Sequence, residues 1–343
     1  MPEQKSGQPA GGIAVLTLNP SVDVTYEVRQ LIREEKVHAL QTRYDPGGNG
    51  INVGRTLKRL GVRAETFCLV AGEIGRFLER MLEQELDARH CLQIPGETRI
   101  NCTLLQVEPR VQYEVTAQGP CVPPWALEAL STGFLHAARA GFGVLTGSLP
   151  PGVSDGTYAG LVRRLRDSGA RAVVDAQAPA LAAAITARPF LIKPNRYELE
   201  MLCGQALPTR AHVVATARDL QRAGVEWVCV SLGAEGAVLV GAEDAYYART
   251  PRINLRSTVG AGDAMLAGLV AGFARGEPPD AVLRTGVACG SATAEQFGTL
   301  LCAPEDVERL GRTIDVERLG PVPVPRKILE PGGAATSRAR ANG

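Results

Sequence analysis

The chain has 343 residues, of which 45% are hydrophobic and 21% are charged, and its formal net charge is +1. This length suits one large α/β domain or two smaller ones, and the apolar content is enough for a sizeable core. A net charge close to zero excludes the strong positive field that attracts nucleic acid or anionic membranes, and no apolar stretch reaches the length of a membrane span. We therefore expect neither nucleic acid nor membrane as a partner.

The cysteines and the two ends of the chain add three expectations. Eight cysteines are scattered without a CxxC pair, and four isolated histidines make no zinc-ligand pattern. This usage favours a reduced, cytoplasmic chain with buried thiols. Residues 1–12 are polar and glycine-rich, and residues 320–343 are rich in Pro, Gly, Ala and Arg, so both are predicted to be disordered tails. The folded domain is expected at 13–313.

The first third of the chain contains both buried and half-exposed strands. An apolar run at 13–18 predicts a buried first strand. Looser, half-alternating runs at 24–28 and 36–44 predict strands with one apolar face, and residues 99–107 and 111–117 predict a hairpin. We expect these four strands to form a small β-sheet lid, covering about residues 23–44 and 99–117.

The rest of the chain alternates regularly between strands and helices. Further strands are predicted at 64–70, near 144, and at 171–175, 190–193 and 227–232, followed by a hairpin at 236–249. Helices are predicted at 51–60, 75–86, 155–168, 178–187, 196–203, 210–223, 264–274, 279–296 and 304–313. This alternation indicates a mainly parallel central sheet with helices on both faces, a three-layer α/β/α arrangement.

A glycine-rich turn precedes the apolar helix near the end of the chain, in STVGAGDAMLAG at 257–268. Gly260 and Gly262 allow a tight turn and leave backbone N–H groups uncovered. Asp263 falls in the first turn of the helix, where orphan N–H donors favour phosphate. A carboxylate there suits a base that takes a proton from an acceptor hydroxyl. The alternative is an ordinary helix-start carboxylate after a turn, and this stretch alone does not decide between them.

A second glycine-rich stretch, PGGNGINVGR at 46–55, opens another predicted helix. Together with the first, it resembles the paired signatures of the ribokinase-like (PfkB) family of sugar kinases, and the resemblance covers about residues 13–313. Neither stretch is a Walker A loop. Neither is a clean GxGxxG fingerprint, because Met265 stands where the last glycine belongs, which weakens a dehydrogenase as the alternative.

The resemblance implies a ribokinase-like fold and ATP-dependent phosphorylation of a sugar hydroxyl. Asp263 would be the base, and the N–H groups of Ala261, Gly262 and Asp263 after Gly260 would stabilise charge on the transferred group. A non-catalytic sensor on the same fold is the rival hypothesis, and the intact Asp263 argues against it.

The family pattern also assigns nucleotide and metal contacts. These are Lys193, Asn195, Ser231, Gly233, Gly236 and Thr258 for ATP, with Asn195 and Glu198 ordering Mg²⁺ through water. Helical spacing in NxxE places the last two side chains on one face. The alternatives are a carboxylate that matches the helix dipole at Glu198, and a plain turn at 231–236.

Seven residues match positions that hold the sugar substrate in the family, namely Asp23, Lys36, Gly48, Asn49, Asn52, Arg99 and Ser148. A guanidinium at Arg99 suits a sugar phosphate, although Lys36 and Arg99 could also be lid-surface charges and Asn52 a solvated polar residue. Asn49 departs from the usual Lys or Gly, and His38 stands where some relatives carry a second basic residue.

These substrate-side matches resemble the hexose-phosphate branch, whose members make a ketohexose 1,6-bisphosphate. The motifs TLNP and TRIN favour fructose 1-phosphate as the substrate, whereas YDPGG and GTLLC favour fructose 6-phosphate, and tagatose 6-phosphate is a third alternative. We expect fructose 1-phosphate. Because a small sheet with one apolar face tends to pair, we also expect a homodimer through the lid.

Overall fold

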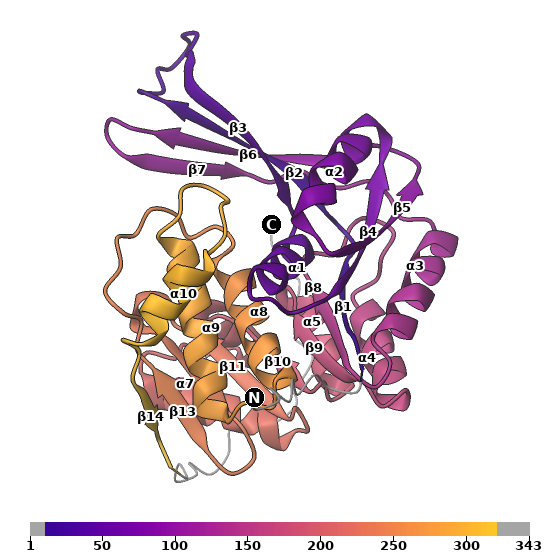
Figure 1. Cartoon of the computed structure of the whole chain (residues 1–343), viewed down its shortest axis with the longest axis vertical. Coiled ribbons are helices and arrows are strands. Elements are labelled where there is room, and N and C mark those ends of the chain that lie inside the picture. Colours follow the sequence, from indigo (N-terminus) through magenta and orange to yellow (C-terminus); the bar gives the residue numbers. More distant parts are fainter. Residues whose placement is uncertain (1–10, 321–343) are drawn as a thin grey trace, which may run out of the picture.

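The computed structural model describes residues 11–320 of the chain, so the predicted tails lie outside the described residues except at their inner ends. Two sheets organise these residues: a large sheet runs through the body of the molecule, and a small one projects from the top (Figure 1). This arrangement confirms the three-layer α/β/α fold with a separate lid.

The large sheet has ten strands, and seven of them run parallel. In spatial order the strands are β14 (Val316–Arg318), β13 (Ala245–Ala248), β12 (Ala237–Val240), β11 (Trp227–Ser231), β10 (Leu191–Ile192), β9 (Arg171–Asp175), β8 (Phe142–Thr146), β1 (Ile13–Thr17), β4 (Glu65–Ala71) and β5 (Ala88–Ile94). Only β12, β13 and β14, at one edge, pair in antiparallel fashion.

Helices cover both faces of this sheet, because neighbouring residues of each strand point to opposite sides. In β1, Leu16 belongs to one apolar cluster and Val15 to the other, and both are fully buried. The first face is covered by α3 (Pro124–Ala137), α4 (Thr157–Asp167), α5 (Ala178–Thr186), α6 (Arg196–Cys203) and α7 (Arg210–Arg222). The second face is covered by α1 (Asn49–Arg59), α2 (Gly72–Glu85), α8 (Ala261–Ala274), α9 (Pro279–Ala294) and α10 (Pro304–Gly311).

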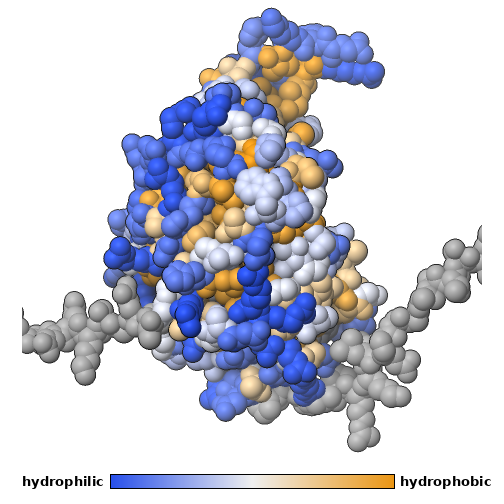
Figure 2. Space-filling model, turned by 90° about the vertical axis from the view of Figure 1, so that its right-hand side faces the viewer, coloured by the Kyte–Doolittle hydropathy of each residue, from blue (hydrophilic) through white to orange (hydrophobic). Residues whose placement is uncertain are grey.

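The lid is a four-stranded sheet in the order β3 (Ala39–Gly47), β2 (Ser21–Val28), β6 (Arg99–Gln106) and β7 (Val111–Val115). Its side chains separate by polarity, as the half-alternating pattern predicts. The register of its strands places Tyr44, Ile100, Tyr113 and Val115 on one face, and each of these side chains is exposed. Figure 2 shows this apolar area near the top of the molecule, just below the hydrophilic tip.

The structure differs from the sequence-based expectations at a few elements. It contains α3, β5 and β14, which the sequence reasoning did not identify. Strand β14 pairs with β13, so the folded unit continues past residue 313. In the lid, β3 begins only at Ala39, so residue 36 lies in the loop before it. Within residues 11–320, no helix combines the length and apolarity that crossing a membrane would need.

Helix α8 is buried nearly all round, between the sheet, α1 and α9. Its contact with α9 is close because Gly268 carries no side chain. A Cβ added there would lie 2.9 Å from both Cys289 Sγ and Gly286 Cα. The close packing fixes the position of the start of α8, where Asp263 lies.

A matched pair of substitutions tests this contact. Alanine is favoured over glycine in helices by about 1 kcal/mol. At Gly160, in α4, nothing lies within 4 Å of an added Cβ, so we expect Gly160→Ala to raise the free energy of unfolding. At Gly268 the neighbouring backbone atom cannot turn aside, and overpacking of about 1–3 kcal/mol outweighs the helical gain. We expect urea unfolding to show a net loss for Gly268→Ala, and equal stabilisation by both substitutions would contradict the close packing.

Candidate active site

Polar residues gather where the parallel strands end, next to the base of the lid. The carboxyl ends of parallel strands meet at one edge of a sheet, which is where ligands bind in folds of this kind. The residues found there are Asn19 after β1, Ser148 after β8, Asp175 at the end of β9, Lys193 after β10 and Ser231 at the end of β11. Asp263 joins them from the first turn of α8.

The turn before α8 has the geometry that its glycines predict. Gly260 adopts the left-handed conformation, with φ 75°, as the residue before the helix. The N–H of Ala261 donates to the Thr258 carbonyl over 3.3 Å, so it is already engaged in the turn. The N–H groups of Gly262 and Asp263 belong to the first turn, where an α-helix supplies no acceptor. These two N–H groups are the better candidates for contacting an anion.

Asp263 is buried, with a side chain held by two amides from α1. Asn49 Nδ2 donates to one carboxylate oxygen over 2.8 Å, and Asn52 Nδ2 donates to the other over 2.9 Å. Burial raises the pKa of Asp263 to about 6, and the two amides and Lys193 partly oppose this rise, whereas Asp175 adds to it. A carboxylate with this pKa is ionised at neutral pH and is close to the range that suits a general base.

Lys193 places a positive charge beside the start of α8. It forms an ion pair with Asp175, with 3.1 Å between Nζ and the carboxylate oxygen, and both side chains are largely buried. A Cβ added at Gly262 would lie 3.5 Å from Lys193 Nζ. The ammonium group and the N–H donors of the first turn therefore surround the same point.

A cavity of about 480 Å³ adjoins the same turn on the side of α9. Four of the residues predicted to contact the nucleotide line it, namely Ser231, Gly233, Gly236 and Thr258, and Ala261 and Gly262 complete this polar side. Its apolar wall consists of Ile253, Leu255, Met265, Val287 and Ala294, among others. An apolar pocket that ends at exposed N–H groups fits a nucleobase at one end and phosphates at the other.

Asn195 and Glu198 form a capping box at the start of α6. Asn195 Oδ1 accepts the Glu198 N–H, and a Glu198 carboxylate oxygen accepts the Asn195 N–H, each over 2.8 Å. Both side chains therefore stabilise the start of α6. For Glu198, a structural role at the helix start is also the alternative that the sequence offers. Within residues 11–320, no group of three His, Cys, Asp or Glu side chains could hold a metal. Their role towards Mg²⁺ stays a prediction.

A second polar cluster lies at the base of the lid, around Asp23. Its carboxylate accepts hydrogen bonds from Ser21 Oγ over 2.7 Å and from Asn101 Nδ2 over 2.9 Å. Burial is the main cause of the raised pKa of Asp23, and Arg99 nearby opposes the rise. Gly47 leaves room for this carboxylate, since a Cβ there would overlap it. The backbone of Gly48, with φ 107°, has a conformation that favours glycine.

Arg99 connects this cluster with the strand ends. Its guanidinium donates to the Asn19 carbonyl over 2.8 Å and to the Ala117 carbonyl over 3.2 Å. The Asn19 side chain in turn donates to Ser148 Oγ over 3.1 Å. Contacts therefore run from the lid base to the loop after β8. Gly147 of that loop lies next to Asn49, since a Cβ added there would be 3.2 Å from Asn49 Oδ1. The predicted substrate residues form one continuous group, apart from Lys36.

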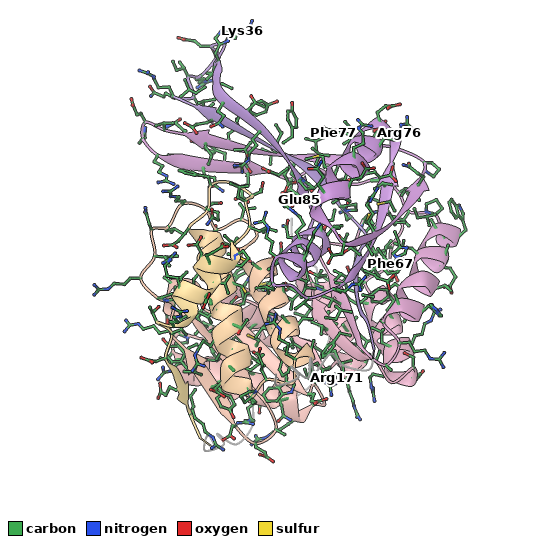
Figure 3. All side chains as sticks on the ribbon, in the orientation of Figure 1. Lys36, Phe67, Arg76, Phe77, Glu85 and Arg171 are labelled. Atoms are coloured by element: carbon green, nitrogen blue, oxygen red, sulfur yellow. The ribbon has the colours of Figure 1, made fainter. Side chains whose placement is uncertain are left out.

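Lys36 lies at the exposed tip of the lid, away from the other predicted residues (Figure 3). Within one copy of the chain, Lys36 therefore does not lie near the strand ends where the other predicted residues gather. In contrast, the structure adds Asp175, Asn101 and the apolar cavity wall, which sequence reasoning missed. Asp175 follows the apolar run Ala172–Val174 at the end of a predicted strand, so the rule that ligands bind at the carboxyl ends of parallel strands would have selected it.

Comparisons with known proteins agree with this geometry. A family model described as pfkB family carbohydrate kinase matches residues 16–306. The 1-phosphofructokinase of Bacillus subtilis (strain 168) is 34% identical over 310 residues, which cover 90% of this chain and 100% of that protein. The 1-phosphofructokinase of Escherichia coli (strain K12) is 34% identical over 289 residues, covering 83% of this chain and 91% of that protein.

Solved structures give the same answer at the level of the fold. The structure of phosphofructokinase-2 from Escherichia coli in complex with substrates and products superposes with a TM-score of 0.85 at 30% identity, covering 88% of this chain and 99% of that one. The structure of the same Escherichia coli enzyme in complex with fructose-6-phosphate superposes with a TM-score of 0.83 at 29% identity, covering 88% of this chain and 99% of that one. The glycine signatures, the ribokinase-like fold and the family match all agree, and the chain belongs to the pfkB family of carbohydrate kinases.

Proposed function

We propose that this carbohydrate kinase transfers the γ-phosphoryl group of ATP to fructose 1-phosphate and makes fructose 1,6-bisphosphate. The observation that carries the proposal is the buried Asp263 carboxylate at the start of α8, beside a nucleotide-sized cavity. Relatives that align over 90% of the chain at 34% identity are 1-phosphofructokinases, which favours that substrate. ATP and sugar phosphates are cytoplasmic metabolites, so we place the enzyme in the cytoplasm.

The proposed chemistry is a direct transfer between two bound substrates. The acceptor hydroxyl gives its proton to Asp263 as its oxygen attacks the γ-phosphorus, and the bond from that phosphorus to ADP breaks. The first-turn N–H groups of Gly262 and Asp263, together with Lys193, stabilise the negative charge on the transferred group. Asp175, ion-paired to Lys193, holds that ammonium in place.

Mg²⁺ is the proposed metal cofactor, and it would neutralise phosphate charge and hold the triphosphate in position. It usually keeps several of its waters and needs few protein ligands. The Glu198 side chain, half-buried near Lys193 and Asp175, fits such an indirect role, because its second oxygen is not used by the capping box.

For the sugar phosphate, we propose binding between the Asp23 cluster and the strand ends. Asp23 and Asn52 can hold sugar hydroxyls, since Asn52 Oδ1 is buried and has no partner among the described residues. Arg99 supplies positive charge at the same place. Its Nε is also buried without a partner in residues 11–320, and that donor suits a phosphate oxygen.

Fructose 6-phosphate is the second candidate substrate, and one observation favours it: the fold superposes well on phosphofructokinase-2 from Escherichia coli, including its complex with fructose-6-phosphate. Tagatose 6-phosphate is a third. All three acceptors give a ketohexose 1,6-bisphosphate, so the proposed product class does not depend on this choice.

A coupled assay of ADP release, with each of the three phosphosugars and with unphosphorylated fructose and ribose, tests the proposal. We expect the highest kcat/KM with fructose 1-phosphate. A higher kcat/KM with fructose 6-phosphate would instead identify that sugar, the second candidate, as the substrate. A preference for an unphosphorylated sugar would overturn the phosphosugar assignment, and binding of nucleotide without turnover of any sugar would indicate a sensor.

Asp263→Asn tests the base. Removing a positioned general base typically lowers the rate by about 10²–10⁴-fold, and we expect at least such a loss in kcat while ATP binding is retained. Because burial raises the pKa of Asp263 to about 6, ionising this group costs folding free energy above that pH. The substitution should therefore not lower the free energy of unfolding at pH 8. A variant that keeps more than about a tenth of the activity, outside this range, would show that Asp263 is not the base.

We also propose that the lid forms a homodimer through its apolar face, and that Lys36 reaches a substrate only if another copy brings the lid tip to its site. Light scattering at micromolar concentration tests the dimer. We expect Val115→Lys and Tyr113→Lys, which place charges on the exposed face, to produce monomers. Trp125→Lys, at a similarly exposed residue on α3, should leave the dimer intact. A monomeric unmodified chain would contradict the proposal.

A further inference from the structure

The two asparagines that hold Asp263 come from one face of one helix. Asn49 and Asn52 lie three residues apart in α1, so their side chains point the same way. Each donates to a different oxygen of the Asp263 carboxylate, over 2.8 and 2.9 Å. The two hydrogen bonds together fix the plane of the carboxylate, because rotation about its bond would break both.

The environments of the two amides differ. Asn52 is buried, and its Oδ1 has no partner among the described residues, which leaves that atom available to a substrate hydroxyl. The Asn49 amide is half-buried between Asp263 and Gly147. A Cβ added at Gly147 would lie 3.2 Å from Asn49 Oδ1 and 3.4 Å from Asn49 Cβ, so the glycine leaves space for the amide. Its nitrogen thereby faces the carboxylate.

The charges that face Asp263 make this amide important. Lys193, after β10, favours the ionised carboxylate, whereas Asp175, at the end of β9, and the burial itself oppose it. From α1 the contribution consists of the two neutral amides. Helix α1 therefore favours the ionised carboxylate through hydrogen-bond donors and adds no charge to the site.

We propose that Asn49 is a positioning residue for the base: its amide orients the Asp263 carboxylate and keeps it ionised, so that it can accept the proton of the acceptor hydroxyl. The inference rests on the proposed function of Asp263. It assigns Asn49 a role towards the base in place of a contact with the sugar alone.

The test is the dependence of kcat on pH at saturating substrates, for the unmodified chain and two variants. Asn49→Ala removes the donor. Asn49→Asp has nearly the same shape but places a carboxylate where the donor was. A hydrogen bond to a charged group corresponds to a pKa change of about one to two units. The acid limb, where kcat falls at low pH, should therefore move up by about one to two pH units in Asn49→Ala. In Asn49→Asp it should move further up, because like charges disfavour ionisation. The substrates ionise in the same way with every variant, so their ionisation does not contribute to the difference between the pH profiles.

Lys58→Ala is the matched control, since Lys58 lies on the same helix and donates to the Gln84 carbonyl away from the site. Its acid limb should coincide with that of the unmodified chain. Circular dichroism and urea unfolding check that each variant is folded. If Asn49→Ala fails to fold, the nearly isosteric Asn49→Asp still gives the answer.

The outcomes separate this inference from the proposed function. Folded Asn49 variants with unmoved acid limbs and only a raised KM would overturn the inference and leave Asn49 as a sugar contact. An active Asp263→Asn variant, or an unmodified chain that phosphorylates none of the sugars, would instead overturn the proposed function. Upward shifts in both Asn49 variants, with Asp263→Asn inactive, would support both.

Discussion

The proposed chemistry depends on keeping one buried carboxylate, that of Asp263, ionised. Burial of Asp263 disfavours its charge, and the fold opposes that cost with donors from two separate segments: the asparagines of α1 and Lys193 after β10. None of these donors works unless α8 occupies one position. The close contact of α8 with α9 at Gly268, and its buried surroundings, supply that constraint.

The start of α8 also divides the site into two sides. The apolar cavity beside Ala261 and Gly262 lies towards α9, whereas the Asp263 carboxylate faces α1 and the loop after β8. A phosphoryl group passing between a nucleotide and a sugar would cross this turn. The glycines permit that arrangement, because a left-handed residue at Gly260 and an uncovered backbone at Gly262 leave the first-turn N–H groups accessible.

One face of the lid carries the polar cluster around Asp23, and the other is the exposed apolar face that we propose for the dimer. Alternation along its strands places Asp23, Arg99 and Asn101 on one side and Tyr44, Ile100 and Val115 on the opposite side. It is also tied to the body: Asp45 accepts hydrogen bonds from Arg43 and Thr299, and Arg43 donates to the Phe297 carbonyl. A movement of the lid would therefore involve the loop after α9, the helix that lines the cavity proposed for the nucleotide.

The sequence by itself determined the periodic elements, the lid with its apolar face, and the two glycine-rich helix starts, because each of these is a local pattern of a few residues. It also predicted Asp263 in the first turn of a helix, because the glycines before it are a local signal. It missed the edge strands β5 and β14, whose short or polar segments become strands only by pairing with a neighbour. Asp175 could have been found from its place at a strand end, but its ion pair with Lys193 could not.

Only the tertiary structure decided which side chains meet. Asn49 and Asp263 are 214 residues apart in sequence, and no local pattern reports a contact across that distance. Likewise, the apolar wall of the cavity combines a loop with two helices, and Lys36 is separated from the site because it lies beyond the far end of β3, at the lid tip. Periodicity encodes which way a side chain points within its own element. The long-range packing of α1 against α8 places the amide beside the base.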